Sequence, residues 1–208
     1  MDLQKNKDQV FAAVAEATQK ANRPENSVSI VAVTKYVDSS TAKELVKTGV
    51  KHIGENRVDK FLEKYLQRRK VKEVINYVDY FHALDSLKLA EEIEKRAEHT
   101  IKCFLQVNVS GEESKHGFAV DEIEAVLPAL EKLEHLEIVG IMTMAPIDAG
   151  EEDLEKIFQA THELQEKLQD KQITNMPFSE ISMGMSRDFA TAIANGSTFV
   201  RIGTSFFK

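Results

Sequence analysis

The sequence predicts an α/β fold of parallel strands and helices, and we expect a closed (β/α)8 barrel of the TIM type with an extra N-terminal helix. Three observations support this prediction. Short apolar runs alternate with longer amphipathic runs along the whole chain, an order typical of parallel α/β folds. The short runs are almost continuously apolar, as strands covered on both faces are. No Gly-x-Gly-x-x-Gly follows the first run, which weakens the alternative of a doubly wound dinucleotide-binding sheet.

The elements follow one another in a regular order. Apolar residues at helical spacing predict an amphipathic N-terminal helix that extends to about Asn22 and is closed by Arg23-Pro24. The expected strands begin at residues 27, 52, 80, 101, 136, 178 and 197. The other expected helices cover 39–48, 86–97, 121–133, 151–170 and 187–195, and one more begins near Arg57.

The strand count is one short of a closed barrel, because seven strands are found where eight are needed. The run FLEKYLQRRKVKEVINYVDY, between Arg57 and Tyr80, must form one long helical region or two helices whose intervening strand is absent. We therefore expect the third strand and its loops to be missing from the chain near Tyr65-Leu66. No Pro/Gly/Ser-rich linker interrupts the sequence, so residues 1–208 are expected to form a single domain.

The composition argues against several classes of function. The chain has 34 acidic and 27 basic residues, a formal net charge of −7, which disfavours a nucleic-acid surface and a polybasic membrane tether. Cys103 is the only cysteine, so no disulfide can form within the chain, and its apolar surroundings predict a buried thiol. The sequence shows neither a signal peptide nor a run near the roughly 18 apolar residues of a membrane span. We expect a cytoplasmic protein, which we take to be a monomer.

Most enzyme signatures are missing from the sequence. The six histidines show no metal-ligand spacing, and there is neither a Walker loop nor a Gly-x-Ser-x-Gly motif, so no metal site is expected. Candidate ligand-binding residues gather instead at the carboxyl ends of the expected strands, where such barrels place their active sites. These residues are Lys35, Glu55, Asn56, Arg57, Asn108, Ser110, Met142, Thr143, Ser186, Arg201, Gly203 and Thr204.

Two segments near the C-terminus predict a phosphate site. ISMGMSRDF leads from a strand through Gly184 to Ser186 at the start of a helix, and VRIGTSFF places Gly203 and Thr204 on the next strand. The loops after the last two strands of such barrels commonly bind phosphate, since glycine allows close approach and a helix N-terminus supplies N–H groups. We therefore expect Ser186, Gly203 and Thr204 to bind a phosphate group.

Lys35 stands at the end of the first strand, SVSIVAVTK, where its charge is costly to place beside a core. A lysine that is desolvated inside a barrel and held near Arg201 loses its proton more readily, and its free amine can then attack an aldehyde. Pyridoxal 5′-phosphate (PLP) is an aldehyde that carries a phosphate. We expect Lys35 to hold PLP as a Schiff base while the phosphate lies across the barrel mouth.

Five motifs carry a resemblance to a known family: VAVTKY, HIGENRV, ESKHGF, ISMGMSRDF and AIANGSTFVRIG. Together they resemble the pyridoxal-phosphate homeostasis proteins, the YggS/PROSC-like family, whose single domain is related to the alanine racemase barrel. The resemblance implies PLP as the cofactor and a role in intracellular vitamin B6 homeostasis. It implies that Arg201 faces the pyridine nitrogen and that Met183 and Met185 line the pocket. The cofactor-binding residues that it implies are Lys35, Asn56, Met183, Met185, Ser186, Arg201, Gly203 and Thr204.

One departure from the family pattern coincides with the missing strand. Members usually carry a segment similar to W-H-x-I-G-x-L-Q before the helix that matches RRKVKEVINYV, and here Lys64-Tyr65 runs straight into Leu66-Gln67. That segment would supply the third strand.

The sequence leaves open whether the protein is an enzyme. Arg201 cannot stabilise a protonated pyridine as a carboxylate would, which disfavours aminotransferase and decarboxylase chemistry. We expect a PLP-binding protein that passes the cofactor to PLP-dependent apoenzymes or buffers its free level. The alternative is a weak PLP-dependent amino-acid racemase, although alternation along the strand turns Tyr36, a candidate second acid/base group, away from Lys35. A barrel without a ligand is a third possibility.

Overall fold

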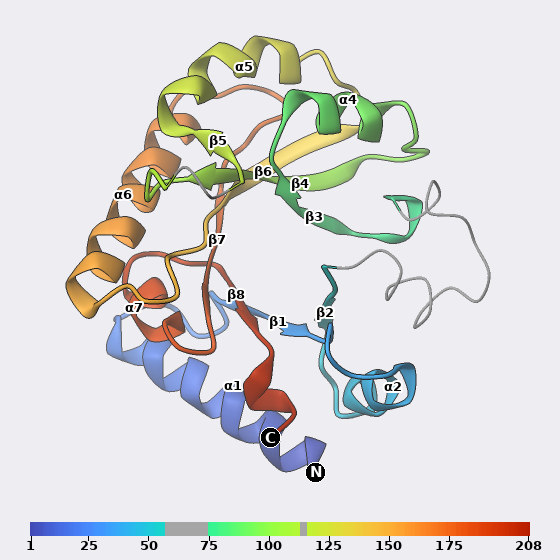
Figure 1. Ribbon diagram of the computed structural model, residues 1–208, viewed down its shortest axis with the longest axis vertical. Helices are drawn as coiled ribbons and strands as arrows, with labels where there is room; N and C mark the ends of the chain where they lie inside the picture. Colours follow the sequence, from blue (N-terminus) through green and yellow to red (C-terminus); the bar gives the residue numbers. More distant parts are fainter. Residues whose placement is uncertain (57–74, 113–115) are drawn as a thin grey trace. The chain divides into compact units, whose positions relative to one another are not determined.

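A computed structural model of the chain describes residues 1–56, 75–112 and 116–208 (Figure 1). The chain divides into two compact units, which we call unit 1 (Met1–Val74 and Met183–Lys208) and unit 2 (Ile75–Ser182). Strand β7 (Glu180–Met185) begins in unit 2 and ends in unit 1. Every strand pair with a described register is parallel, so the predicted α/β class is confirmed.

Unit 1 combines a long N-terminal helix with short strand–helix repeats. Asp2 and Asp38 begin its first two helices, since each carboxylate accepts a backbone N–H, from Lys5 and Thr41 respectively, as N-cap residues do. The elements are α1 (Leu3–Lys20), β1 (Ser29–Val33), α2 (Ser39–Lys47), β2 (His52–Gly54), the last residues of β7, α7 (Phe189–Ala194), β8 (Phe199–Ile202) and the 3-10 turn η3 (Thr204–Phe206).

The sheet of unit 1 has β1 between β2 and β8, and it has two different faces. Ile30, Ala32, Val200 and Ile202 pack into a core with residues of α1, α2 and α7. Residues between them on β1 and β8 must point the other way, because side chains alternate along a strand. We call this opposite side the inner face. Val31 and Arg201, which are register partners, lie on it.

Unit 2 is a longer run of the same repeat. Its sheet order is β7, β6, β4 and β3, and the two-residue strand β5 pairs with the end of β4. The elements are β3 (Tyr80–Leu84), α4 (Leu87–Glu94), β4 (Ile101–Asn108), β5 (Phe118–Ala119), the 3-10 turn η2 (Val120–Glu122), α5 (Ile123–Leu130), β6 (Leu136–Met142), α6 (Glu151–Gln169) and the start of β7.

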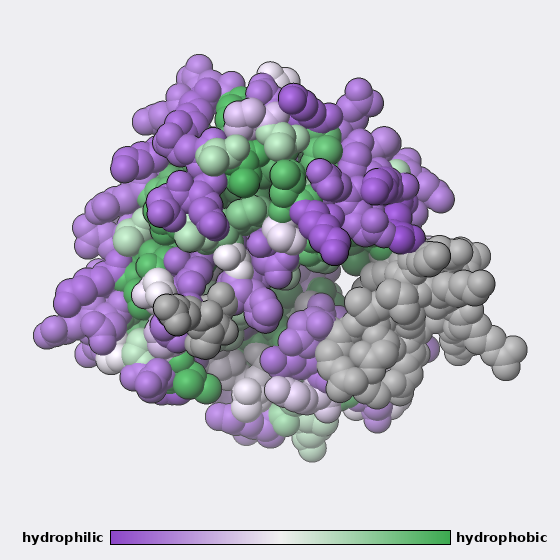
Figure 2. Space-filling model, turned by 45° about the horizontal axis from the view of Figure 1, so that its top comes forward, coloured by the Kyte–Doolittle hydropathy of each residue, from purple (hydrophilic) through white to green (hydrophobic). Residues whose placement is uncertain are grey.

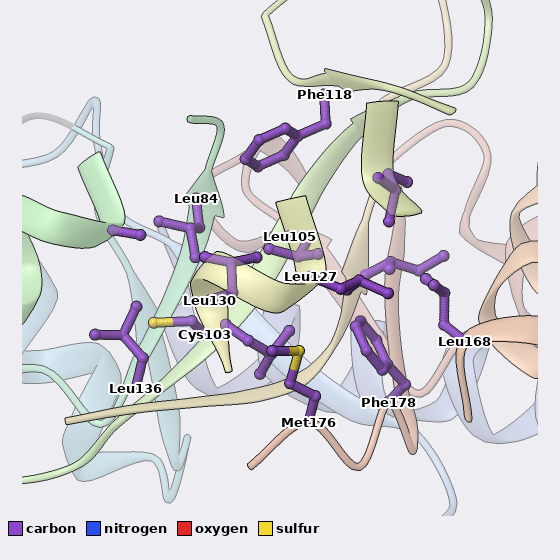
Figure 3. Close-up of a cluster of buried hydrophobic side chains, with 14 of the residues drawn as sticks. Leu84, Cys103, Leu105, Phe118, Leu127, Leu130, Leu136, Leu168, Met176 and Phe178 are labelled. Atoms are coloured by element: carbon purple, nitrogen blue, oxygen red, sulfur yellow. The ribbon is translucent and has the colours of Figure 1, made fainter. Parts of the chain in front are cut away.

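The main core of unit 2 lies between the sheet and its helices (Figure 3). Cys103 and Leu105 of β4 pack there with Leu127 and Leu130 of α5 and with Leu168 of α6. The Cys103 thiol is buried as predicted, and burial raises its pKa to about 12, so it stays a neutral, packed side chain at physiological pH.

A side-chain hydrogen bond shows that the sheet of unit 2 is strongly curved. His82 of β3 and Ser182 of β7 are joined by a 2.9 Å Nδ1···Oγ hydrogen bond, although β4 and β6 lie between those strands. In a flat sheet three strand spacings separate the two backbones by about 14 Å, which a histidine and a serine cannot bridge. The inner face of unit 2 is therefore concave, as in the wall of a barrel.

The predicted elements match the observed ones with shifts of a few residues at their ends. Strand β5 was not predicted, because two residues are too few to show an alternating pattern. The predicted loss of a strand near Tyr65-Leu66 and the helix from Arg57 lie outside the described residues. The single-domain assignment stays a prediction.

Hydrophilic side chains cover most of the face seen in Figure 2, with apolar ones between them. No helix in the described part of the chain is long and apolar enough to cross a membrane.

Candidate functional site

The predicted cofactor-binding residues all belong to unit 1, and all lie on, or within two residues of, the carboxyl ends of its strands. Neighbouring strand ends contact one another there. Thr34, just after β1, donates its backbone N–H to the Gly54 carbonyl at the end of β2 over 2.9 Å. On the other side of β1, Val33 lies against Gly203, where an added Cβ atom would be 3.3 Å from the Val33 carbonyl oxygen. The ends of β2, β1 and β8 thus form one continuous edge.

Lys35 occupies a tight turn that directly follows β1. Val37 donates its N–H to the Thr34 carbonyl over 3.1 Å, so Lys35 and Tyr36 are the two central residues of the turn. Lys35 is half-buried, whereas Tyr36 is 88% exposed. The turn holds the lysine amine at the strand end without placing it in the apolar core.

Tyr36 does not point away from Lys35, so the alternation argument was wrong for this residue. The Lys35 Nζ atom lies 5.0 Å from the centroid of the Tyr36 ring, within the range of a cation–π contact. The strand ends at Val33, and strict alternation therefore does not extend to residues 35 and 36.

Ser186 and Gly203, predicted to share a phosphate, are brought together by the fold. The Gly203 N–H donates to the Ser186 Oγ atom over 3.3 Å, and the accepting hydroxyl keeps its own proton for a further acceptor. Gly184, two residues earlier, has a φ of +91°, and a Cβ on it would lie 2.6 Å from the Ala192 Cβ atom of α7. Glycine at position 184 lets α7 pack close to the end of β7.

Arg201 lies on the inner face of β8, two residues before Gly203. It is half-buried, and burial lowers the pKa of its guanidinium to about 10, against the opposing influence of the Asp188 carboxylate. A group with that pKa is still protonated at neutral pH, so Arg201 remains a cation that donates hydrogen bonds.

The remaining predicted cofactor-binding residues are less closely tied to this edge. Met183 is fully buried and Met185 is half-buried, both on β7. Asn56 and Thr204 are exposed, and the contacts of the described residues do not join either side chain to Lys35. Their roles stay predictions.

The wider set of strand-end candidates divides between the two units. Glu55 follows β2 in unit 1, and Arg57 lies outside the described residues. The candidates that belong to unit 2 are Asn108, Ser110, Met142 and Thr143.

Two arrangements were not predicted. Asp188, which comes two residues after Ser186 in SRDF, is buried and accepts the Met185 N–H. It is the N-cap residue of α7, but its side chain makes no capping hydrogen bond to the helix, so the capping pattern of the sequence gives its position and not its contact. The pair His82 and Ser182 of unit 2 left no signal, since its members are 100 residues apart in sequence.

The chain matches the protein family described as "Alanine racemase, N-terminal domain" over residues 7–208. A protein of Aquifex aeolicus (strain VF5) named "Pyridoxal phosphate homeostasis protein" is 35% identical, and the alignment covers 95% of this chain and 94% of the relative. That alignment runs over 216 positions, more than the 208 residues of this chain, so the relative carries positions that this chain lacks.

Two solved structures extend the comparison. PipY of Synechococcus elongatus PCC7942, in a structure described as having PLP bound, is 27% identical with a TM-score of 0.80, and the match covers 94% of this chain and 100% of PipY. Alanine racemase from Corynebacterium glutamicum has a TM-score of 0.69 at 15% identity, and the match covers 95% of this chain and 61% of the racemase. At that identity the likeness to the racemase shows the fold alone.

Proposed function

The chain belongs to the family of the pyridoxal phosphate homeostasis proteins, and from this premise we propose that it binds PLP reversibly through Lys35 and serves vitamin B6 homeostasis as a carrier. The relatives are named pyridoxal phosphate homeostasis proteins, and PipY has a structure described as having PLP bound. The observation that carries the proposal in this chain is the continuous edge formed by the ends of β2, β1, β8 and β7.

The residues at this edge fit the chemical groups of PLP. The residues assigned to this edge offer the primary amine of Lys35, the guanidinium of Arg201, and the Ser186 hydroxyl beside the Gly203 backbone. Gly203 lies close to Val33, since an added Cβ atom would be 3.3 Å from the Val33 carbonyl oxygen. This is the donor set that an aldehyde, a pyridine nitrogen and a phosphate require.

Lys35 supplies the amine. When bound, PLP supplies an aldehyde that condenses reversibly with a primary amine and releases water. The turn from Thr34 to Val37 holds Lys35 at the carboxyl end of β1, where the residue is half-buried. Reversible capture and release at one amine is what a carrier needs.

Ser186, Gly203 and Thr204 hold the phosphate in this proposal. The Ser186 hydroxyl donates its proton to a phosphate oxygen, and the Gly203 backbone, which lacks a side chain, allows close approach. Arg201 precedes Gly203 by two residues on β8, so it lies about 7 Å deeper along the strand. We thereby assign the phosphate to Gly203 and the ring nitrogen to Arg201, two residues earlier in the chain.

Arg201 favours the carrier over an aminotransferase or a decarboxylase. A guanidinium that is protonated at neutral pH would donate a hydrogen bond to the pyridine nitrogen and keep that nitrogen unprotonated, which would weaken the electron sink that most PLP enzymes use. Asn56, Met183 and Met185 complete the assigned lining. Delivery to PLP-dependent apoenzymes, a monomeric state, a single domain over residues 1–208 and a cytoplasmic location are further parts of the proposal.

One observation favours the alternative, a weak amino-acid racemase. The Tyr36 ring lies beside the Lys35 amine, and a phenol could serve as a second acid/base group. Lys35 and Tyr36 share one turn, however, whereas racemisation requires groups on opposite faces of the substrate carbon. Incubation of the PLP-loaded protein with L-alanine in deuterated water separates the two functions, since the carrier should exchange no α-proton at an enzyme-like rate.

Borohydride reduction tests the proposal directly. Protein incubated with PLP and then reduced should carry one stable adduct, which peptide mapping places on Lys35. Lys35→Ala should abolish the adduct, and Lys51→Ala, which removes an exposed lysine from the same unit, should leave it unchanged. An adduct on another lysine, or none at all, would refute the proposed function.

A further inference from the structure

Asp188 is the one charged residue among the buried polar side chains identified in the described part of the chain, at 8% exposure. It stands between the end of β7 and α7, two residues after Ser186. A buried carboxylate is unfavourable unless its oxygens are hydrogen-bonded and a compensating charge is near. The hydrogen bonds that the Asp188 carboxylate makes therefore indicate what the residue does.

Those contacts close a short turn. The Asp188 Oδ1 atom accepts the Met185 N–H over 2.5 Å, and the Asp188 N–H donates back to the Met185 carbonyl over 3.1 Å. The Asp188 carbonyl accepts the Ala192 N–H over 3.0 Å and begins α7. The segment from Met185 to Asp188 is thus held by a reciprocal pair of bonds at one end and by a helix at the other.

Ser186 lies inside this turn, and its position depends on it. The two bonds between Met185 and Asp188 fix the backbone on both sides of Ser186, and the Ser186 Oγ atom accepts the Gly203 N–H. Without the carboxylate, the Met185 N–H would lose its partner and Ser186 would be free to turn away from Gly203. Arg201, whose guanidinium feels the field of Asp188, supplies the compensating positive charge.

We propose that Asp188 is a positioning residue for the anionic end of the ligand: its buried carboxylate fixes the Met185–Asp188 turn and so holds the Ser186 hydroxyl against Gly203. The inference rests on the proposed function for the identity of the ligand. It predicts that Asp188 acts on phosphate binding through Ser186 and makes no contact with the phosphate itself. The hydrogen-bond acceptor, rather than the negative charge, is what the turn requires.

Two substitutions at this position separate the acceptor from the charge. Asp188→Asn keeps an oxygen that can accept the Met185 N–H, whereas Asp188→Ala removes it. The readout is the ratio of the affinity for PLP to the affinity for pyridoxal, which lacks the phosphate, so that effects on the ring end cancel. We expect Asp188→Ala to lower this ratio at least tenfold and Asp188→Asn to keep it within about twofold of the unsubstituted protein.

A double substitution tests the route through Ser186. Ser186→Ala alone should lower the same ratio, and adding Asp188→Ala to it should lower the ratio no further. An additive loss would show that Asp188 acts on the phosphate by another route and would overturn the inference. An unchanged ratio in Asp188→Ala would overturn it as well.

Amide hydrogen exchange in the ligand-free protein provides a readout that needs no bound cofactor. The Met185 and Gly203 amides should be protected in the unsubstituted protein, and Asp188→Ala should speed their exchange at least tenfold while the Leu105 amide of unit 2 stays protected. Fast exchange of Met185 in the unsubstituted protein contradicts the inference even if Asp188→Ala fails to fold. If Lys35 captures no PLP, the proposed function fails, and the exchange rates still decide whether Asp188 holds the turn.

Discussion

The inner face of the unit 2 sheet is filled by packed side chains, whereas the inner face of unit 1 carries Val31 and the charged Arg201, and Gly203 directly follows β8 there. In unit 2, Phe104 of β4 is fully buried and stacks on His82 with ring centroids 4.3 Å apart, and His82 in turn bonds Ser182. In unit 1, the inner face of β8 offers Arg201 and then Gly203. The same strand–helix repeat thus forms a face of packed side chains in unit 2, and in unit 1 it forms an edge at which β8 is followed by a glycine.

The difference indicates that the inner face of unit 2 contributes mainly to stability, whereas the strand ends of unit 1 serve binding. Aromatic and hydrogen-bonded side chains on a concave face exclude water and hold the curvature of the sheet. A strand end with few large side chains leaves a hydroxyl and a few charged groups within reach of a ligand. The comparison predicts that equivalent substitutions will have opposite consequences in the two units.

Gly140→Ala should give the largest effect, and it affects stability. A Cβ atom at Gly140 of β6 would overlap the Glu180 carbonyl oxygen of β7, so the two strands would have to separate. We expect a loss of about 4 kcal/mol or more in the free energy of unfolding, in the range reserved for severe core defects. Urea denaturation of the purified variant measures this, and a loss below about 1 kcal/mol would contradict the close approach of the strands.

Gly203→Ala makes the same chemical change in unit 1 and should act on binding. Its Cβ would lie 3.3 Å from the Val33 carbonyl oxygen, a contact that a small shift relieves, and the reduced freedom of the unfolded chain offsets part of the cost. We expect an unfolding free energy within about 1 kcal/mol of the unsubstituted protein, with PLP affinity reduced about tenfold. Spectroscopic titration with PLP checks the second value. Unimpaired affinity would break the comparison, since Gly203 would then be a packing glycine like Gly140.

The sequence patterns predicted the strands and the positions at which the strands end. Near-continuous apolar runs identified the parallel strands, and their ends identified the edge at which Lys35, Ser186 and Gly203 gather. In the structure the residues of β8 alternate as expected for a strand, with Val200 and Ile202 in the core and Arg201 on the opposite face. These features depend on local spacing, which a sequence displays directly.

The rest depends on geometry that local spacing does not contain. Tyr36 was misplaced because the strand ends at Val33 and the chain then turns, so alternation does not extend to residue 36. The bond between Ser186 and Gly203 joins residues 17 apart, and the bond between His82 and Ser182 exists only because the sheet curves. Turn geometry and sheet curvature are set by tertiary packing, and they decide which polar groups meet.

Substitutions of His82 and Ser182 test the packed inner face of unit 2, and we expect a moderate effect on the free energy of unfolding. If their hydrogen bond helps to hold the concave sheet, a double-mutant cycle with His82→Ala and Ser182→Ala should give a coupling free energy of about 1 kcal/mol. Urea denaturation of the four proteins supplies it. The borohydride-stabilised adduct on Lys35 should be equally abundant in all four. A coupling near zero would remove the structural role, and a lost adduct would assign the pair to the site.

Lowering the pH should give the smallest effect on the free energy of unfolding. It should act on the helix that begins at Asp38 and not on the helix that begins at Ser86. Asp38 caps α2 after β1 in unit 1, whereas Ser86 caps α4 after β3 in unit 2. Hydrogen bonds from the Thr41 backbone and from Ser40 lower the pKa of Asp38 from 3.8 to about 2. Because the folded-state pKa is depressed, the stabilisation by Asp38 is present above pH 3.8 and is lost as the pH falls towards about 2.

Asp38→Asn isolates that contribution, because asparagine caps helices as well as aspartate does but does not titrate. Between about pH 4 and about pH 2 the unfolding free energy of the Asp38→Asn variant should fall less steeply than that of the unsubstituted protein, while Ser86→Asn should leave the slope unchanged. Urea denaturation at a series of pH values in this window gives both slopes. Identical slopes for Asp38→Asn and the unsubstituted protein would mean that the ionised carboxylate does not stabilise the start of α2.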